Sequence, residues 1–319
     1  MALFYGSYVG YGSSASVAAW VWQGENYGYC YGRGPAPWLG DVDKYSFTSD
    51  TNGADVGNQY ETRRVYTSAT SETHGYCAGG DAAPATHGNT IDKFPFAAAD
   101  GFTMTDVGNL ATKSHYANGS SSTTHGYVTG GANPAVTAQM QKYPFASDTG
   151  SSNTAVMVGG ARAAGSGHND DGFVYGYHAG GGPAGTNIID RYPYASDSDS
   201  TDWADLSHTT NQNQGCSSLT DGYSVGNYNI GGPASYWNDE IMKFNFASGG
   251  TGTQPSILTT SVYGPSSSSS TTHGYRAGGD TGWVGTLHID KFIFSSDVNA
   301  ATVGNLSRIG DYMGSGSQY

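Results

Sequence analysis

Three histidines stand at the same place in a recurring motif, and they are the first residues whose type and spacing could bind a metal ion. His74, His125 and His273 each precede a Gly-Tyr pair. Imidazole is a good zinc ligand, but a zinc site needs ligands within a few ångströms of one another. Equivalent positions of a repeated unit are held apart by the symmetry of the assembly. We therefore interpret these histidines as structural.

The cysteines and the tyrosines beside them form a second candidate for chemistry. Cys30 and Cys77 each directly follow a tyrosine of the same motif, and Cys216 stands elsewhere. A disulfide needs two Cα atoms within about 7 Å, and equivalent positions of neighbouring units should lie farther apart. Free cysteine otherwise packs as a small hydrophobe. We expect reduced cysteines that serve packing, and no disulfide framework.

Acidic side chains in short turns make a third candidate. These turns occupy residues 49–55, 196–202 and 295–297. Calcium takes about six to eight oxygen ligands, and Asp197, Asp199 and Asp202 are the best residues to supply them. Aspartate and serine in such turns also bond to the nearby backbone, which is the interpretation we favour. The prediction is no metal, with a weak calcium alternative at these three carboxylates.

All of these residues belong to one repeated unit. The motif His-Gly-Tyr-x-x-Gly-Gly occupies residues 74–80, 125–131 and 273–279, and weaker copies surround three further tyrosines. The anchoring tyrosines are spaced by 47, 51, 50, 46 and 52 residues: Tyr29, Tyr76, Tyr127, Tyr177, Tyr223 and Tyr275. A block similar to Ile-Asp-Lys-Phe-Pro-Phe follows each anchor, at 42–47, 91–96, 140–145, 189–194, 241–246 and 289–294. Such self-similarity is typical of a repeat architecture.

The repeated blocks predict β-strands. Asp92, Phe94 and Phe96 fall on one face of the block 91–96, which is the period of an extended chain. Tyrosine, phenylalanine, valine and isoleucine fill the blocks, and glycine, serine, aspartate and asparagine fill the gaps. A segment of small residues precedes each anchor, as at 120–124 and 266–272, and suits an innermost strand. Each unit therefore holds about four strands, with little helix.

Six units of four short strands predict an all-β fold: a β-propeller of six blades, with four antiparallel strands per blade. Seven blades are an alternative, because residues 17–23 and 308–319 both resemble the first strand of a unit. We expect one propeller domain over residues 17–319, with the ring closed by joining the N- and C-terminal segments. Residues 1–16 would form an arm or a closing strand.

The charge and the hydropathy pattern exclude several classes of partner. The 319 residues include 13 lysines and arginines against 26 aspartates and glutamates, a formal net charge of −13. This balance argues against a nucleic-acid grip. There is no apolar run of roughly 18 residues, so we expect no membrane insertion. The N-terminus lacks the pattern of a signal peptide, which predicts synthesis in a cytoplasm without export by the general route.

Aromatic side chains in the loops after Gly-Gly are the strongest candidates for binding. Units one, five and six carry them, and these units become neighbours when a ring closes: Trp38, Tyr236, Trp237 and Trp283. An exposed aromatic cluster usually marks a partner or ligand surface. The alternative is that each tryptophan covers its own unit or seals the ring. We predict an aromatic arc that binds a ligand or partner, and no catalytic residues.

The unit resembles the kelch repeat, which also builds the central domain of galactose-oxidase-like proteins. The resemblance rests on a basic residue before the first strand, a strand ending in Gly-Gly and an Asp-basic-aromatic strand, and it spans roughly residues 17 to 319. The tryptophan expected near the fourth strand is mostly replaced by Val-Gly-Asn, and Trp203 is the one good match. The blocks His-Gly-Tyr-x-x-Gly-Gly, Ile-Asp-Lys-Phe-Pro-Phe and Val-Gly-Asn-Leu are also similar to repeats in tail-fibre and other virion proteins of tailed bacteriophages, including marine cyanophages.

The second resemblance implies a non-enzymatic virion protein, such as a tail fibre or tail tip, whose loops bind a host glycan or envelope receptor. Such a protein would contact other virion proteins and occur in multiple copies. The alternatives are a structural decoration or adaptor protein of the virion, a propeller enzyme and a cellular kelch adaptor. Galactose-oxidase chemistry implies a copper ion and a tyrosine crosslinked to cysteine. Tyr29 and Tyr76 stand beside cysteines, but neighbours along a strand point to opposite faces, so we expect no cofactor.

Overall fold

Small antiparallel sheets make up the part of the chain that the computed structural model describes, residues 22–33, 38–82, 86–160, 165–170, 172–182, 184–229, 236–282, 284–310, 313–314 and 316–319. These residues contain no helix, and the all-β prediction is confirmed for them. It follows that none of the described segments is a helix with the length and apolar character that crossing a bilayer requires. Six sheets of four or five strands recur along the sequence, in step with the six repeated units.

We number these sheets in chain order and give their strands from the centre outward. Sheet 1 contains β29 (Ser317–Gln318), β1 (Tyr27–Arg33), β2 (Leu39–Ser46), β3 (Ala54–Asn58) and β10 (Phe102–Thr103). Sheet 2 contains β5 (Thr67–Thr70), β6 (His74–Ala78), β9 (Thr90–Pro95) and β11 (Thr105–Asn109). Sheet 3 contains β12 (Asn118–Ser121), β13 (His125–Thr129), β14 (Gln139–Pro144) and β15 (Ser152–Val156).

The other three sheets follow the same order. Sheet 4 contains β16 (Ser166–Asn169), β17 (Tyr175–Ala179), β18 (Thr186–Pro193), β19 (Thr201–Thr210) and β23 (Gly250–Thr251). Sheet 5 contains β20 (Gln214–Ser217), β21 (Asp221–Asn229), β22 (Tyr236–Asn245) and β24 (Thr253–Val262). Sheet 6 contains β25 (Ser266–Ser269), β26 (His273–Ala277), β27 (Thr286–Ile293) and β28 (Ala301–Gly310). A smaller sheet joins β4 (Arg63–Arg64), β7 (Asp81–Ala82) and β8 (Thr86–His87).

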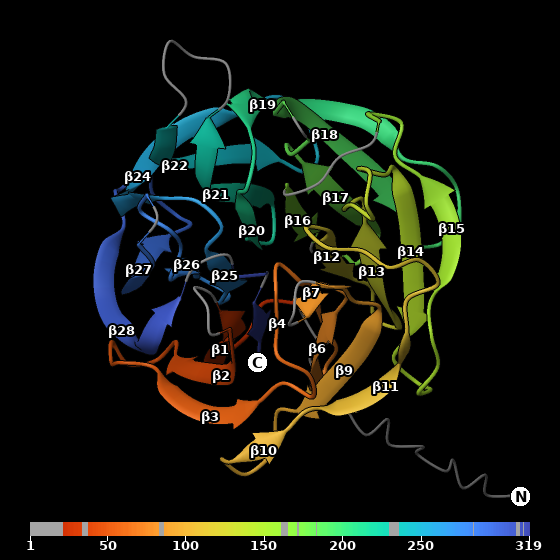
Figure 1. Ribbon diagram of the computed structural model, residues 1–319. Helices are drawn as coiled ribbons and strands as arrows, with labels where there is room; N and C mark the ends of the chain where they lie inside the picture. The colour runs from red at the N-terminus through yellow and green to blue at the C-terminus, as the bar shows by residue number, and fades with distance from the viewer. Residues whose placement is uncertain are drawn as a thin grey trace, which may run out of the picture.

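The first strands of the sheets, which we call the inner strands, form a closed circle. Each contacts the next in the order β5, β12, β16, β20, β25 and β29, and β29 contacts β5 again. Figure 1 shows the sheets arranged around this common centre. Serine, glycine, threonine and alanine dominate these strands because the backbones approach closely there. The prediction that the Ser-rich segments form innermost strands is confirmed for β12 and β25.

The C-terminal segment supplies the inner strand of sheet 1. Strand β29 pairs with β1 through Gly28–Gln318 and Tyr29–Ser317. The other segment predicted for this role, residues 17–23, is described only from Trp22 onward. There the Gln23 Nε2 donates to the Ser217 carbonyl at 3.1 Å, and the Gly24 amide donates to Ser269 at 2.8 Å. The chain therefore crosses the ends of β20 and β25 before it enters sheet 1. The predicted arm at residues 1–16 lies outside the described residues.

The repeated tyrosines hold neighbouring sheets together. Tyr76 stacks on Phe145 of the next sheet with ring centroids 4.8 Å apart, and Tyr275 of sheet 6 stacks on Phe47 of sheet 1 at 4.5 Å. The equivalent pairs complete the circle: Tyr29–Phe96, Tyr127–Tyr194, Tyr177–Phe246 and Tyr223–Phe294. Aromatic pairs in such geometry add about 0.5–1.5 kcal/mol each beyond the area they bury. The interval between anchor tyrosines along the sequence thus corresponds to one sheet of the structure.

The repeated Asp-basic pair also joins neighbouring sheets. Asp290 of sheet 6 accepts hydrogen bonds from Thr259 of sheet 5, and Asp43 of sheet 1 accepts them from Ser307 of sheet 6. The lysines reach the acidic turns of the following sheet at 2.5–3.1 Å: Lys44–Asp100, Lys93–Asp148, Lys142–Asp197 and Lys291–Asp50. These contacts place the acidic turns at one end of the ring. The loops after Gly-Gly lie at the other end, which we call the loop face.

Candidate functional site

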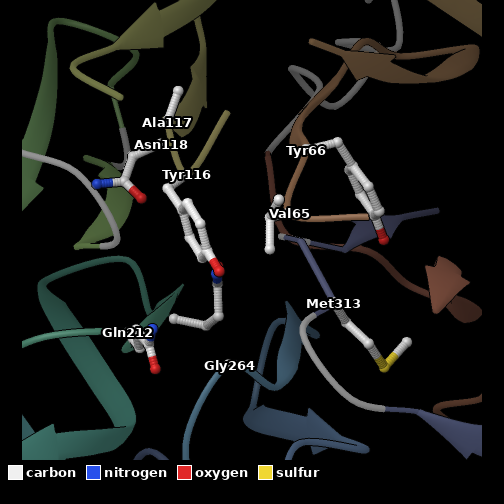
Figure 2. A pocket seen from close by; sticks show the side chains of 9 residues that line it. Val65, Tyr66, Tyr116, Ala117, Asn118, Gln212, Gly264 and Met313 are labelled. Atoms are coloured by element: carbon white, nitrogen blue, oxygen red, sulfur yellow. The ribbon is translucent and has the colours of Figure 1, made fainter. Parts of the chain in front are cut away.

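The centre of the loop face opens into a small cavity, which we call the axial cavity. Its volume is about 20 Å³, enough for about one water molecule. Residues from four sheets and from the C-terminal segment surround it in Figure 2: Val65, Tyr66, Tyr116, Ala117, Asn118, Gln212, Gln214, Gly264 and Met313. The cavity is too small to enclose a sugar. It can hold a water beneath a ligand that lies on the face.

The rim of this cavity is built from one repeated backbone position, two residues before an inner strand. Val65, Tyr116 and Gln212 have φ of 48°, 55° and 55°, and Gly264 has 56°. A left-handed conformation is unusual for a side chain other than glycine, and most of all for valine. The side chains at this position differ from unit to unit although the backbone repeats. These rim residues were not predicted, because their side chains share no local pattern and only their position before the inner strands repeats.

Two polar side chains line the cavity wall, and they differ in whether their polar atoms have hydrogen-bond partners. The Asn118 amide nitrogen lies 3.0 Å from a ring nitrogen of the buried His178. The Gln214 Oε1 is buried and has no hydrogen-bond partner among the described residues. A buried amide oxygen without a partner is costly, and a water in the cavity would satisfy it. The axial cavity therefore offers an acceptor to a small polar guest.

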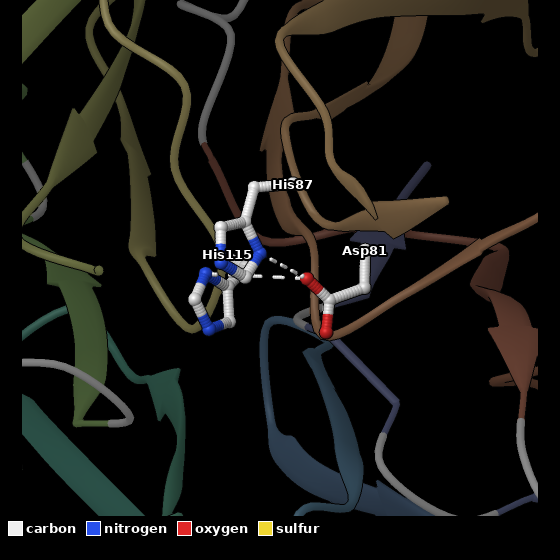
Figure 3. Close-up of side chains that lie close together, drawn as sticks. All are labelled: Asp81, His87 and His115. Atoms are coloured by element: carbon white, nitrogen blue, oxygen red, sulfur yellow. Dashed lines mark hydrogen bonds and ion pairs between the residues drawn. The ribbon is translucent and has the colours of Figure 1, made fainter. Parts of the chain in front are cut away.

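A second group of side chains lies beside this cavity, and we call it the Asp81–His87–His115 cluster. Asp81 and His87 come from the hairpin between β7 and β8, and His115 directly precedes Tyr116 of the cavity rim. The His87 Nδ1 lies 2.8 Å from the Asp81 Oδ1, and the His115 Nδ1 lies 4.0 Å from the same oxygen. Figure 3 shows both imidazoles facing the one carboxylate.

The two imidazoles of the cluster are stacked, with ring centroids 3.9 Å apart and planes within 8° of parallel. The His115 Nδ1 also lies 2.8 Å from the Ala132 carbonyl oxygen. Burial lowers the pKa of His115 below its ordinary value, although Asp81 acts in the opposite direction. His115 is therefore neutral at neutral pH, with a lone pair on one ring nitrogen.

The structure describes two of the four aromatic residues predicted to form the arc. Trp38 is half-buried beneath Arg64, whose guanidinium carbon lies 4.6 Å from the ring centroid. Trp237 is half-buried near Tyr263, with ring centroids 6.4 Å apart. Tyr236 opens β22, but its side chain lies outside the description, as does Trp283 entirely. Trp38 and Trp237 belong to sheets 1 and 5, with sheet 6 between them, so continuity of the arc depends on Trp283.

The carboxylates of the calcium alternative make other contacts. Asp197 forms an ion pair with Lys142 at 2.5 Å, and Asp199 accepts a hydrogen bond from the Val156 amide at 3.0 Å. Asp202 lies on β19 opposite Asp190 of β18. Within the described part of the chain, the Asp81–His87–His115 cluster is the one group of three or more His, Cys, Asp and Glu with ligand atoms close together. The calcium alternative stays a prediction.

The repeated histidines and the cysteines lie where packing explains them. His74, His125 and His273 begin β6, β13 and β26, and each Nδ1 lies 2.8 Å from the hydroxyl of the preceding threonine. The three cysteines are free and buried: Cys30, Cys77 and Cys216. Burial raises the pKa of Cys77, which keeps its thiol protonated. The three histidines therefore lie in three different sheets, and their structural role and the reduced state of the cysteines stay predictions.

No family model matches the chain, and no curated protein matches it.

Proposed function

We propose that the six sheets are the blades of one β-propeller, formed by residues 17–319 and closed by the C-terminal strand β29. The closed circle of inner strands and the circle of tyrosine pairs support this architecture. One four-stranded sheet cannot bury both of its faces, and radial packing lets each blade cover the next. The sequential order of the sheets around the centre fits a ring of six blades.

We further propose that this ring is a non-enzymatic scaffold on a bacteriophage virion, in a tail fibre, tail tip or similar component, and that its loop face binds a host glycan or envelope receptor. The observation that carries the proposal is that repeated side chains and unit-specific side chains occupy different parts of the molecule. Side chains that repeat in every unit contact neighbouring sheets, whereas side chains that differ between units gather around the axial cavity and in the loops after Gly-Gly. Recognition by a repeat scaffold resides in such variable loops.

The aromatic side chains supply the contact surface in this proposal. Trp38 carries a cation above its ring, and Trp237 lies near the start of β22, directly after the loop that follows Gly-Gly. Tryptophan and arginine are over-represented among the residues that dominate binding energy. Binding by a single face would be shallow, because the axial cavity admits only a water. Several copies on one particle would raise the overall affinity.

Replacing Trp38 and Trp237 together with alanine is expected to weaken binding to host cells by about tenfold or more, because aromatic anchors commonly contribute over ~1.4 kcal/mol each. The measurement is a saturation curve of fluorescently labelled, multimerised protein on candidate host cells. The matched control is Trp203→Ala, since Trp203 also lies under an arginine, Arg191 at 3.4 Å, but on an outer strand.

Unchanged binding by the double variant would contradict a receptor surface at these two tryptophans. Absence of binding by the folded, multimerised wild-type protein would favour the alternative, a structural decoration or adaptor protein whose loop face contacts another virion protein. Thermal unfolding of each variant separates loss of a contact from loss of the fold.

A further inference from the structure

The Asp81–His87–His115 cluster has the composition of a transition-metal site. Two imidazoles and one carboxylate are a common zinc set in which the fourth position stays open. The ligand atoms of the three side chains all lie within 4.8 Å of one another. In a tetrahedral zinc site each ligand is about 2.1 Å from the ion, so two ligands lie roughly 3.4 Å apart. The Asp81 Oδ1 and the His87 Nδ1 lie 2.8 Å apart, so these two atoms need to separate only slightly to bind the same ion.

The backbone around the cluster holds the side chains in place from two neighbouring sheets. Asp81 and His87 are paired across β7 and β8, where the two residues are directly opposite each other. His115 is fixed by its own backbone, which exchanges hydrogen bonds with Ala132 at 2.9 and 3.3 Å. The three ligands therefore converge through rigid backbone pairing.

The ring nitrogens are prepared for a cation. The Nδ1 of His115 donates to the Ala132 carbonyl at 2.8 Å, which leaves the lone pair on Nε2. Carbonyl groups orient ligating imidazoles in this way in many zinc sites. In His87 the proton that lies between its Nδ1 and Asp81 is the one a cation would replace. The two rings are stacked in parallel planes, so one imidazole has to rotate out of the stack before both lone pairs can point at one ion.

The cluster is also accessible. The His87 side chain is 31% exposed, while that of Asp81 is 11% exposed. A buried carboxylate beneath a half-exposed imidazole leaves one side of the site facing solvent. That side can hold a water, or a donor atom from a molecule bound on the loop face.

We propose that Asp81, His87 and His115 bind one Zn²⁺ ion at the edge of the axial cavity, with the fourth position open to water. The sixth unit has an aspartate at the equivalent position but lacks the two histidines. Asp280 stands at the position of Asp81 in the sixth unit, directly after Gly-Gly, and its carboxylate accepts a hydrogen bond from the Gly282 amide at 2.7 Å. The site is therefore a feature of one blade.

Isothermal titration of the full chain, stripped with a chelator, tests the proposal with ZnCl₂ as the probe. The expected result is one ion per chain, with the affinity lowered more than about a hundredfold by His87→Ala or by His115→Gln, because loss of a ligand exceeds the usual effect of its outer partners. Asp280→Asn and His208→Ala are the matched controls, and they should retain the wild-type affinity. Co²⁺ in place of Zn²⁺ should give the absorption of a tetrahedral site in the wild type.

The proposal is overturned if the folded wild-type protein takes up no Zn²⁺ at tens of micromolar ion. It is equally overturned if one ion binds and both histidine variants retain the affinity, since the ion then lies elsewhere. His87 is the safer position to change because it is partly exposed, and His87→Asn provides a second variant if the alanine form unfolds.

Discussion

Asp290→Ala is expected to lower the free energy of unfolding by about 3–5 kcal/mol, because it leaves a buried arginine without its counter-charge. Asp290 and Arg276 are both fully buried and lie 2.5 Å apart. The same carboxylate accepts hydrogen bonds from the hydroxyls of Thr259 and Thr302 at 2.7 and 2.8 Å. Since Thr259 belongs to sheet 5, the variant also removes a link between two sheets.

The adjacent position supplies the control for this prediction. Lys291 forms an ion pair with Asp50, whose side chain is 54% exposed. An exposed pair of this kind contributes about 0–1 kcal/mol. Urea unfolding of Asp290→Ala and Lys291→Ala should therefore give a large loss and a small one. Equal losses would show that burial does not decide the strength of these repeated contacts.

The effect of Asp290 should also depend on pH. Burial alone would raise the pKa of Asp290, but Arg276 and the two threonine hydroxyls outweigh it and hold the pKa below its ordinary value. A carboxyl whose pKa is lower in the folded state stabilises the protein above the unfolded pKa, about 3.9. This contribution is lost as the pH falls through the folded pKa. The stability difference between wild type and Asp290→Ala should shrink below about pH 4.

Gly119→Ala is expected to lower the free energy of unfolding by about 3 kcal/mol, at the upper end of the usual penalty for overpacking. A Cβ atom at Gly119 would lie 1.8 Å from the Ser68 carbonyl oxygen of the neighbouring inner strand. A backbone carbonyl cannot avoid the clash by rotating, as a side chain can, so β5 and β12 would have to separate. The same contact recurs one sheet on, where a Cβ at Gly167 would lie 2.0 Å from the Gly119 carbonyl.

A glycine with room around it tests whether the close approach is the cause. A Cβ at Gly53 would come no nearer than 3.5 Å to the Lys44 carbonyl, an ordinary contact. Gly53→Ala should change stability by well under 1 kcal/mol in the same denaturant experiment. If Gly119→Ala proved as mild, the inner strands would not be packed as closely as this circle requires.

The repeated part of the structure could be predicted from the sequence, because each structural feature is encoded in several copies of the unit. Several units contain the same features: the anchor tyrosine, the acidic-basic pair and the small residues of the inner strand. Equivalent contacts between neighbouring sheets require the same residue types in successive units. The closing strand was harder to predict. Residues 17–23 and 308–319 both had the composition of an inner strand, and the two residues Ser317–Gln318 make the pairing.

The candidate sites could not be predicted in the same way, because they depend on residues that do not repeat. His87 and His115 stand at unrelated positions of two units, and they are brought together by the pairing of β7 with β8 and by the bridge between His115 and Ala132. The placing of Arg64 over Trp38 is likewise particular to one unit. The left-handed backbone at Val65 has no local sequence signal, because valine disfavours it and the ring imposes it.

Attachment of a bulky polymer to one face of the ring tests whether the loop face binds the receptor. Val284 and Val298 are 61% and 62% exposed, and they lie beyond opposite ends of β27. The native cysteines are buried, so Val284→Cys and Val298→Cys each offer one reactive thiol to a polyethylene glycol maleimide. The polymer is expected to abolish host-cell binding when attached at position 284 and to leave it intact at 298. Binding blocked only from position 298 would contradict this expectation.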